Sequence, residues 1–371
     1  MSTGEQLVFL AVIGGRFVLP LLIPRWPLPA IIACLVLDAA DQTIFQSMGY
    51  NPPGYQSYDK AMDVYYLAVA YLSMLRNWAS IPAFRVGWFL YFYRLIGVVA
   101  FELSHVRALL LVFPNTFEYF FDAYEGIRSR WRPTRWGLRW WIGVAAFIWI
   151  FIKLPQEWWI HVAQLDFTDF LADHSWAGPT IVILLLAAFG VFWVWGRPRL
   201  LPADYGWRFA ADPLPAGLAT SAEQEKAYAK DGAVWSTATL EKVVLLGLLS
   251  VIFQQTLPGV EASNVQIFIG VAAVVVVNAA FSLALARRAH NIPSIGLTFL
   301  ARLVANVVLV TVAAWVLPRN GDGHISVSAT LFFLTMISLL TTMHDRWHPV
   351  HSHRVKLDEE AADALQPTGQ G

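Results

Sequence analysis

Apolar residues in this chain gather into runs that are long enough to form membrane-spanning helices. A spanning helix needs about 20 mostly apolar residues, whereas strands are much shorter, so the pattern predicts an all-α protein. We expect a polytopic integral membrane helical bundle with about eleven transmembrane helices, within a range of about 10–12. The expected spans are residues 6–22, 29–47, 61–75, 86–102, 105–124, 139–155, 178–196, 240–256, 264–286, 293–317 and 327–343.

Polar stretches between these runs divide the chain into five parts. Residues 1–124 form an N-terminal transmembrane bundle with many polar side chains, and residues 240–343 form an apolar C-terminal bundle. Residues 125–196 hold a basic loop, two spans and an acidic amphipathic segment of the kind that lies on a membrane surface. Residues 197–239 form a polar loop that we expect in the cytoplasm. Residues 344–371 form a cytoplasmic tail, which we expect to be partly disordered because its end is polar.

The composition excludes several classes of protein. Hydrophobic residues make up 57% of the 371 positions and charged residues 14%, against about 25% charged residues in soluble domains. The formal net charge is zero, so the expected partners are membrane lipids and not nucleic acid, and the oligomeric state stays open. The single cysteine, Cys34, excludes a disulfide framework and a thiolate metal site. The sequence also contains no motif for a nucleotide cofactor.

The distribution of basic residues predicts how the chain is oriented. Five arginines lie between residues 128 and 139, whereas the next connection, residues 156–174, contains neither lysine nor arginine. Basic loops mark the cytoplasmic side of a membrane. We therefore expect the C-terminus in the cytoplasm, the N-terminus outside and the chain in the cell (inner) membrane. The same alternation places the loops around Arg25 and Arg76 on the cytoplasmic side.

Four aspartates lie at the edges of the second and third apolar runs, where a charge is costly to place. Asp38 and Asp41 are three residues apart and Asp59 and Asp63 are four apart, so each pair shares a helix face. If the two helices pack as an antiparallel hairpin, the four carboxylates converge. They then need protons or a hard divalent cation such as Mg²⁺ or Mn²⁺ to offset their repulsion. The alternative is that all four are helix-end carboxylates at the membrane interface.

The spacing of these aspartates resembles the motif of CDP-alcohol phosphotransferases, which are polytopic membrane enzymes. That motif has two aspartates separated by two residues, a glycine, an Ala-Arg pair, a second glycine, and two aspartates separated by three residues. The resemblance implies that Asp38, Asp41 and Asp59 bind the metal and that Asp63 is the base that deprotonates an acceptor alcohol. It covers residues 38–63 alone, and the chain departs from the motif at Gln42, Phe45, Gln46 and Tyr55.

A second group of charges begins at Arg94, which lies in the middle of an apolar run. A buried arginine requires an acceptor, and we expect it to pair with one of the aspartates or with Glu118. Pro114 frees a backbone carbonyl between them, because proline has no N–H. Arg94 and Glu118 are therefore candidate substrate-binding residues, with Arg94 gripping a phosphate or a carboxylate. The alternative is an ion pair that locks the helices together.

Two further patterns lie toward the C-terminus. His344 and His348 form an HxxxH pair that could hold a transition metal, although we expect Pro349 to break the helix there and the tail to be solvated. Asn278, Arg302 and Asn306 interrupt the apolar C-terminal spans, and we expect them to make hydrogen bonds between helices.

Three classes of function fit these patterns. The first is a divalent-metal-dependent membrane enzyme that acts on a lipid or a lipid-linked phosphate at the aspartates. The second is a proton- or ion-coupled transporter, in which the same charges line a path. The third is a non-catalytic membrane assembly protein whose polar residues only lock helices together. The sequence favours the first class but does not decide among the three.

Overall fold

The computed structural model describes residues 3–47, 55–163, 170–171, 173–256, 263–287, 295–316 and 327–364. Within these ranges the chain is helical and contains no strand, so the predicted all-α class is confirmed. The principal helices are α1 (Thr3–Val18), α2 (Pro27–Ser47), α3 (Tyr55–Asn77), α4 (Ile81–Ser104), α5 (Ala108–Val112), α6 (Thr116–Arg128), α7 (Leu138–Phe147), α8 (Leu154–Glu157), α10 (Ala177–Val191), α11 (Ser221–Asp231), α12 (Thr237–Thr256), α13 (Asn264–Arg287), α14 (Ile295–Val316) and α15 (Val327–Ala364).

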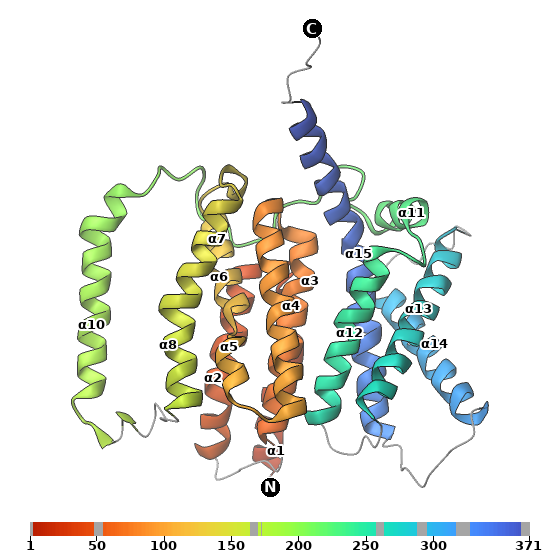
Figure 1. Cartoon of the computed structure of the whole chain (residues 1–371), viewed down its shortest axis with the longest axis horizontal. Helices are drawn as coiled ribbons and strands as arrows, with labels where there is room; N and C mark the ends of the chain where they lie inside the picture. Colours follow the sequence, from red (N-terminus) through yellow and green to blue (C-terminus); the bar gives the residue numbers. More distant parts are fainter. Residues whose placement is uncertain are drawn as a thin grey trace.

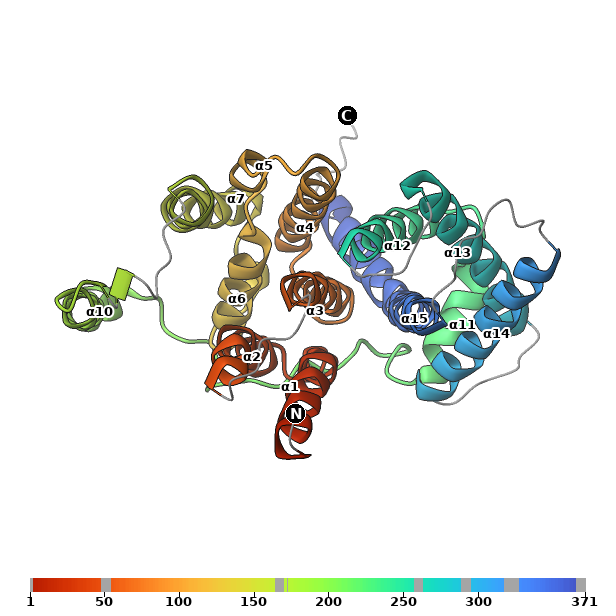
Figure 2. The same cartoon turned by 90° about the horizontal axis from the view of Figure 1, so that it is seen from below.

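The helices form two groups that meet in the middle of the molecule (Figure 2). One group contains α1 to α7, and the other contains α11 to α15. They join where α15 packs against α3 and where α12 packs against α4 (Figure 2). Helix α10 stands at the edge of the molecule (Figure 1), and most of its large apolar side chains are exposed.

Several helices have the properties of membrane spans. Five described helices are long and apolar enough to cross a membrane, namely Ile81–Ser104, Leu138–Ile160, Ala177–Arg199, Thr237–Gln255 and Asn264–Ala284. Two further apolar helices, Gln6–Leu22 and Gly296–Thr311, are shorter. These helices support a membrane location, but the expected count of about eleven spans is not confirmed.

One expected span is interrupted for a reason that is visible in the sequence. Residues 105–124 form two helices, α5 and α6, which are separated at Phe113 to Asn115. Pro114 cannot donate a backbone hydrogen bond, so the helix stops before it. A Cβ added to Gly97 on α4 would lie 2.1 Å from the Cβ of Phe113 and would therefore collide with this break. Glycine therefore allows α4 to approach the break closely.

A buried aromatic cluster fixes α6 and α7 against the end of α3. The rings of Trp78 and Tyr124 stack with their centroids 3.8 Å apart, and Trp141 lies 5.3 Å from Tyr124. The indole N–H of Trp78 donates to Glu125 at 2.9 Å, and Glu125 also accepts from Arg128. The polar tip of Trp78 is satisfied while its ring is buried, which is the arrangement that stabilises a tryptophan in a core.

The loops that were predicted to share one side of the membrane lie together at one end of the helices. The guanidinium of Arg76 donates to the carbonyl of Pro24 at 3.0 Å, and the N–H of Ala211 donates to the carbonyl of Arg25 at 2.8 Å. The N–H of Arg208 donates to the carbonyl of Ser129 at 3.0 Å. The N-terminus lies at the opposite end (Figure 1).

The region after the last expected span differs from the predicted solvated tail. Helix α15 continues through Pro349 to Ala364, so the break expected at Pro349 is wrong, and the polar end of the tail is helical as far as Ala364. Neighbouring helices hold this part of α15: Trp347 and Val350 are buried, and Arg354 donates to the carbonyls of Leu75 and Trp78 at 3.4 and 3.3 Å. Packing thus compensates for the hydrogen bond that the proline cannot make.

The two polar segments in the middle of the chain differ in how much of each the structure describes. Within the acidic amphipathic segment, residues 164–169 and 172 lie outside the described residues. The loop 197–239 contains α11, which begins at a capping box formed by Thr220 and Glu223. Helix α11 packs across α13 and α15.

Candidate functional site

The four aspartates predicted from the sequence converge on one arginine. Arg16 lies in the last turn of α1 and is 5% exposed. Its guanidinium donates to Asp41 at 2.5 Å, to Asp59 at 2.6 Å and to Asp63 at 2.8 Å, and it also bonds Asp38. Arg16 therefore ties α1 to both helices that carry the aspartates. Arg16 is a lone charge inside an apolar run, and no local spacing in the sequence indicates this role.

The helical spacing of the aspartates explains how they meet. Two positions three or four residues apart lie on one helix face, so α2 presents Asp38 and Asp41 together and α3 presents Asp59 and Asp63 together. One oxygen from each of Asp38, Asp59 and Asp63 lies within 4.8 Å of the others. The expected convergence across two helices is thus present, although the connection between them, residues 48–54, lies outside the described residues.

The four carboxylates differ in their access to solvent. The side chain of Asp41 is fully buried, whereas those of Asp38, Asp59 and Asp63 are 29%, 34% and 40% exposed. A buried carboxylate needs a cationic partner, and Asp41 has one in Arg16. The fully enclosed Asp41 binds Arg16. The carboxylates of Asp38, Asp59 and Asp63 also reach solvent and can contact a ligand there.

The cluster contains more negative than positive charge. Four carboxylates surround one guanidinium, so three negative charges lack a counter-charge within the cluster when all four are ionised. Carboxylates this close repel one another, and protons or a further cation relieve the repulsion. The cluster therefore has the charge of a cation-binding site even with Arg16 in place.

The half-exposed carboxylates fit a hard divalent cation. Such an ion takes oxygen ligands at about 2.0–2.6 Å, so two of its ligands lie at most about 5 Å apart. The separations of up to 4.8 Å among Asp38, Asp59 and Asp63 are within this limit. Each carboxylate has two oxygens and about four lone-pair sites, so bonding to Arg16 leaves acceptor capacity for an ion.

A second polar group lies next to the aspartates and contains Glu118, one of the two predicted substrate-binding residues. Tyr66 is on α3 three residues after Asp63, and its hydroxyl donates to the buried carboxylate of Glu118 on α6. The amide of Asn115 donates to the same carboxylate at 2.6 Å. The side chain of Glu118 is thus held in place by two donors from different elements.

The other predicted substrate-binding residue, Arg94, does not make the expected carboxylate hydrogen bond. Its guanidinium donates at 2.8 Å to the carbonyl of Phe113 instead. This carbonyl is available because the chain is not helical between Phe113 and Asn115, as Pro114 requires. The break at Pro114 thus supplies a carbonyl, that of Phe113, and Arg94 bonds to it.

Arg94 nevertheless connects the two polar groups electrostatically. Its charge interacts with Asp63 and Glu118, and with Glu157 on α8. Glu157 in turn pairs with Lys153 at 3.7 Å and accepts from the N–H of Asn115 at 3.4 Å. A continuous set of charged and polar side chains thus extends from Arg16 through α3 and α6 to α8.

His344, the first histidine of the HxxxH pair on α15, is buried against an acidic side chain. His344 is 1% exposed, and its Nε2 lies 3.1 Å from a carboxylate oxygen of Glu241 on α12. The hydroxyl of Tyr71 donates to the same oxygen at 2.5 Å. Among the described residues, the group with the spacing of metal ligands is the one formed by Asp38, Asp59 and Asp63.

Two charged residues of α12 and α15 form a pair that the sequence did not indicate. Lys242 and Asp345 form a buried ion pair at 2.5 Å, and Arg302 on α14 adds a second bond to Asp345 at 2.8 Å. The available signal was a lysine beside the start of an apolar run and an aspartate just past the end of another. The bonds that Asn278 and Asn306 make, by contrast, were expected: their amides meet at 2.5 Å between α13 and α14.

Comparison with known proteins finds no relative of this chain. No family model, no curated protein and no solved structure matches the chain. The site is therefore interpreted from its own chemistry.

Proposed function

We propose that this chain is a divalent-cation-dependent membrane enzyme that acts on a lipid or a lipid-linked phosphate. The observation that supports it most is the convergence of Asp38, Asp59 and Asp63, three half-exposed carboxylates on two helices with oxygens within 4.8 Å of one another. The spacing resemblance to CDP-alcohol phosphotransferases is a second support.

In this proposal the aspartates have different roles. Asp38 and Asp59 bind Mg²⁺ or Mn²⁺, which neutralises phosphate charge and polarises the bond to the leaving group. Asp63 has the most exposed side chain of the four, at 40%, and accepts the proton of the attacking hydroxyl. Asp41, which the motif assigns to the metal, holds Arg16 instead, because it is fully enclosed. Arg94 and Glu118 bind the substrate beside them.

A Mn²⁺ titration separates these roles. We expect purified wild-type protein to bind Mn²⁺, detected by loss of the free-ion electron paramagnetic resonance signal, and Asp59→Asn to lose that binding. Asp231→Asn is the matched control, since Asp231 is an exposed aspartate on α11 with a 58% exposed side chain. We expect Asp63→Asn to keep Mn²⁺ but to lower lipid-phosphate turnover by about a hundredfold or more, as loss of a general base does. Equal Mn²⁺ binding by wild type and Asp59→Asn would refute the assignment.

Ion-coupled transport is the second candidate, and one observation favours it. Arg16 bonds all four carboxylates at once, so an arriving proton or metal ion competes with an internal cation and can shift the contacts of α1. This candidate predicts ion flux into sealed proteoliposomes that Asp63→Asn abolishes, with no lipid turnover. A non-catalytic assembly protein would show neither flux nor turnover, and the same variant would change stability alone.

We also propose that the basic end of the helices faces the cytoplasm of the cell (inner) membrane. Arginine-rich loops gather at that end, and basic loops mark the cytoplasmic side. Single cysteines placed at Thr3 and at Asp231 in a Cys34→Ala background test this. We expect an impermeant maleimide to label position 3 in intact cells and position 231 only after lysis; the reverse pattern would invert the orientation.

A further inference from the structure

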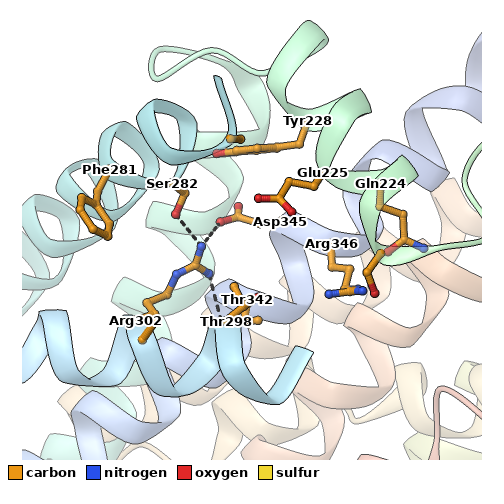
Figure 3. A pocket seen from close by; sticks show the side chains of 13 residues that line it. Gln224, Glu225, Tyr228, Phe281, Ser282, Thr298, Arg302, Thr342, Asp345 and Arg346 are labelled. Atoms are coloured by element: carbon orange, nitrogen blue, oxygen red, sulfur yellow. Dashed lines mark hydrogen bonds and ion pairs between the residues drawn. The ribbon is translucent and has the colours of Figure 1, made fainter. Parts of the chain in front are cut away.

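A cavity lies between the C-terminal helices, far along the chain from the aspartates (Figure 3). It has a volume of about 90 Å³ and is lined by side chains from α11, α13, α14 and α15. Tyr228 and Gln224 line it from α11, Ser282 from α13, and Arg302 from α14. Figure 3 shows Ser282 and Asp345 pointing at the guanidinium of Arg302.

Positive charge exceeds negative charge around this cavity. Arg302 is 5% exposed and donates to Ser282 at 2.6 Å, to Thr342 at 3.1 Å and to Asp345 at 2.8 Å. Asp345 is already paired with Lys242 at 2.5 Å. One carboxylate therefore serves two cations. The cavity wall itself carries two cations, Arg302 and Arg346, and two carboxylates, Glu225 and Asp345. The one surplus positive charge therefore comes from Lys242, which pairs with Asp345 and does not line the cavity.

An apolar groove continues from the cavity along α13 and α14. It is lined by Val277, Asn278, Phe281, Ala305, Asn306, Val308 and Leu309. Phe281 lines both spaces, so the cavity and the groove adjoin each other. The side chains of Val277, Phe281 and Val308 are about half exposed, at 47%, 48% and 56%. The groove therefore opens on the outer face of two apolar helices.

We propose that this cavity and groove bind one anionic phospholipid, with its phosphate headgroup at Arg302 and Arg346 and an acyl chain along α13 and α14. A surplus positive charge next to an open apolar groove complements a molecule that joins a negative head to a hydrocarbon tail. A free phosphate ion would satisfy the head end alone and would leave the groove without an occupant. The proposal is independent of the cation site, which lies in the other group of helices.

Three variants test the head and the groove separately. Arg346→Gln removes a cationic side chain from the wall while leaving the bonds of Arg302 intact. Ala305→Trp fills the groove. Val304→Trp is its matched control, because Val304 is the neighbouring residue on α14, is 63% exposed and does not line the groove.

The measurement is native mass spectrometry of the full chain with phosphatidylglycerol or phosphatidylcholine of identical acyl chains. We expect wild type to retain one phosphatidylglycerol with about a tenfold preference over phosphatidylcholine, the factor that one charged hydrogen bond supplies. Arg346→Gln should lose the preference but still bind lipid. Ala305→Trp should lose both lipids, and Val304→Trp should behave as wild type.

Three results would overturn the proposal. The first is equal retention of the two lipids by wild type. The second is an equal effect of the two tryptophan substitutions at matched melting temperature. The third is displacement of phosphatidylglycerol by millimolar glycerol phosphate, which would show a site for a small soluble anion. If Ala305→Trp does not fold, the preference of Arg346→Gln decides: an unchanged preference overturns the assignment of the headgroup.

Discussion

The two groups of helices each bury an arginine, and the surroundings of the two arginines have opposite charge. Arg16 bonds four carboxylates, three of them half exposed, so the first region has surplus negative charge. Arg302 shares the single carboxylate of Asp345 with Lys242, so this buried cluster of three residues has one surplus positive charge. A buried arginine alone therefore says little about function. The sign of the charge left over around it indicates which ligand the region can bind.

The largest difference between the regions should appear when each arginine is removed. Arg16→Gln leaves four carboxylates without a cation, whereas Arg302→Gln leaves Asp345 paired with Lys242. Removing one partner of a buried ion pair typically costs about 3–5 kcal/mol. We expect Arg16→Gln to reach this range and Arg302→Gln to cost clearly less, measured as loss of thermal stability in detergent.

Added Mg²⁺ should also distinguish the Arg16→Gln variant from the Arg302→Gln variant. Mg²⁺ should restore part of the melting temperature of Arg16→Gln, because it replaces the lost positive charge among the aspartates. It should have no effect on Arg302→Gln. Equal losses for the two variants, or equal responses to Mg²⁺, would remove the distinction between the regions.

Two glycines test how tightly each region is packed. A Cβ at Gly97 would lie 2.1 Å from the Cβ of Phe113, an atom fixed to the backbone. A Cβ at Gly247 on α12 would lie 2.4 Å from the ring edge of Phe268, which can rotate. Overpacking costs about 1–3 kcal/mol, so we expect Gly97→Ala to fall in this range and Gly247→Ala to be milder. Chemical denaturation measures the free energy of unfolding of both variants. A smaller loss for Gly97→Ala than for Gly247→Ala would contradict the role of the Phe113 contact.

Mild acid should act on the second region through the histidines of α15. Burial lowers the pKa of His348 to about 4 and that of His351 to about 3, below the unfolded value of about 6.5. The unfolded chain therefore binds protons first, and stability falls as the pH drops from about 7 toward these folded values. At pH 5 we expect a loss of about 1 kcal/mol per histidine, reduced because both rings are partly exposed.

The matched variant for this prediction is His351→Phe. It keeps the stacked contact with Phe84, in which the ring centroids are 3.8 Å apart, and removes the titrating group. Its melting temperature should decrease less than that of wild type between pH 7 and pH 5. An unchanged slope would mean that other groups control the acid response.

The smallest expected effect is a gain of stability. Asp63→Asn removes one of four repelling carboxylates and keeps an oxygen that can accept from Arg16. Relief of like-charge repulsion should raise the free energy of unfolding by about 0.5 kcal/mol at low salt, and the gain should shrink as salt screens the charges. A clear loss of stability would show that Arg16 needs all four charges.

The sequence predicts the helical class and the convergence of the aspartates, because both depend on local periodicity. Apolar runs define the helices, and spacings of three and four residues place each aspartate pair on one face. Arg16 is different: it lies 22 residues or more before its partners, so only tertiary packing brings it to them. Arg94 could be predicted to need an acceptor, but not to find it at Phe113 rather than at a carboxylate.

Pro349 shows the same limit in the C-terminal region. Proline predicts a break from local chemistry, yet α15 continues because Trp347 and Val350 are buried against other helices. The pairing of Lys242 with Asp345 joins residues 103 positions apart, which no local spacing indicates. Tertiary contacts thus decide what local patterns leave open.

The most direct test of the central claim is the stoichiometry of Mn²⁺ binding to purified wild-type protein and to Asp59→Asn, with Asp231→Asn as the control. We expect wild type and Asp231→Asn each to bind one Mn²⁺ ion at the aspartates, and Asp59→Asn to bind none there. Retention of that site in Asp59→Asn, or no Mn²⁺ binding by wild type, would contradict the assignment of the surplus negative charge around Arg16 to a cation.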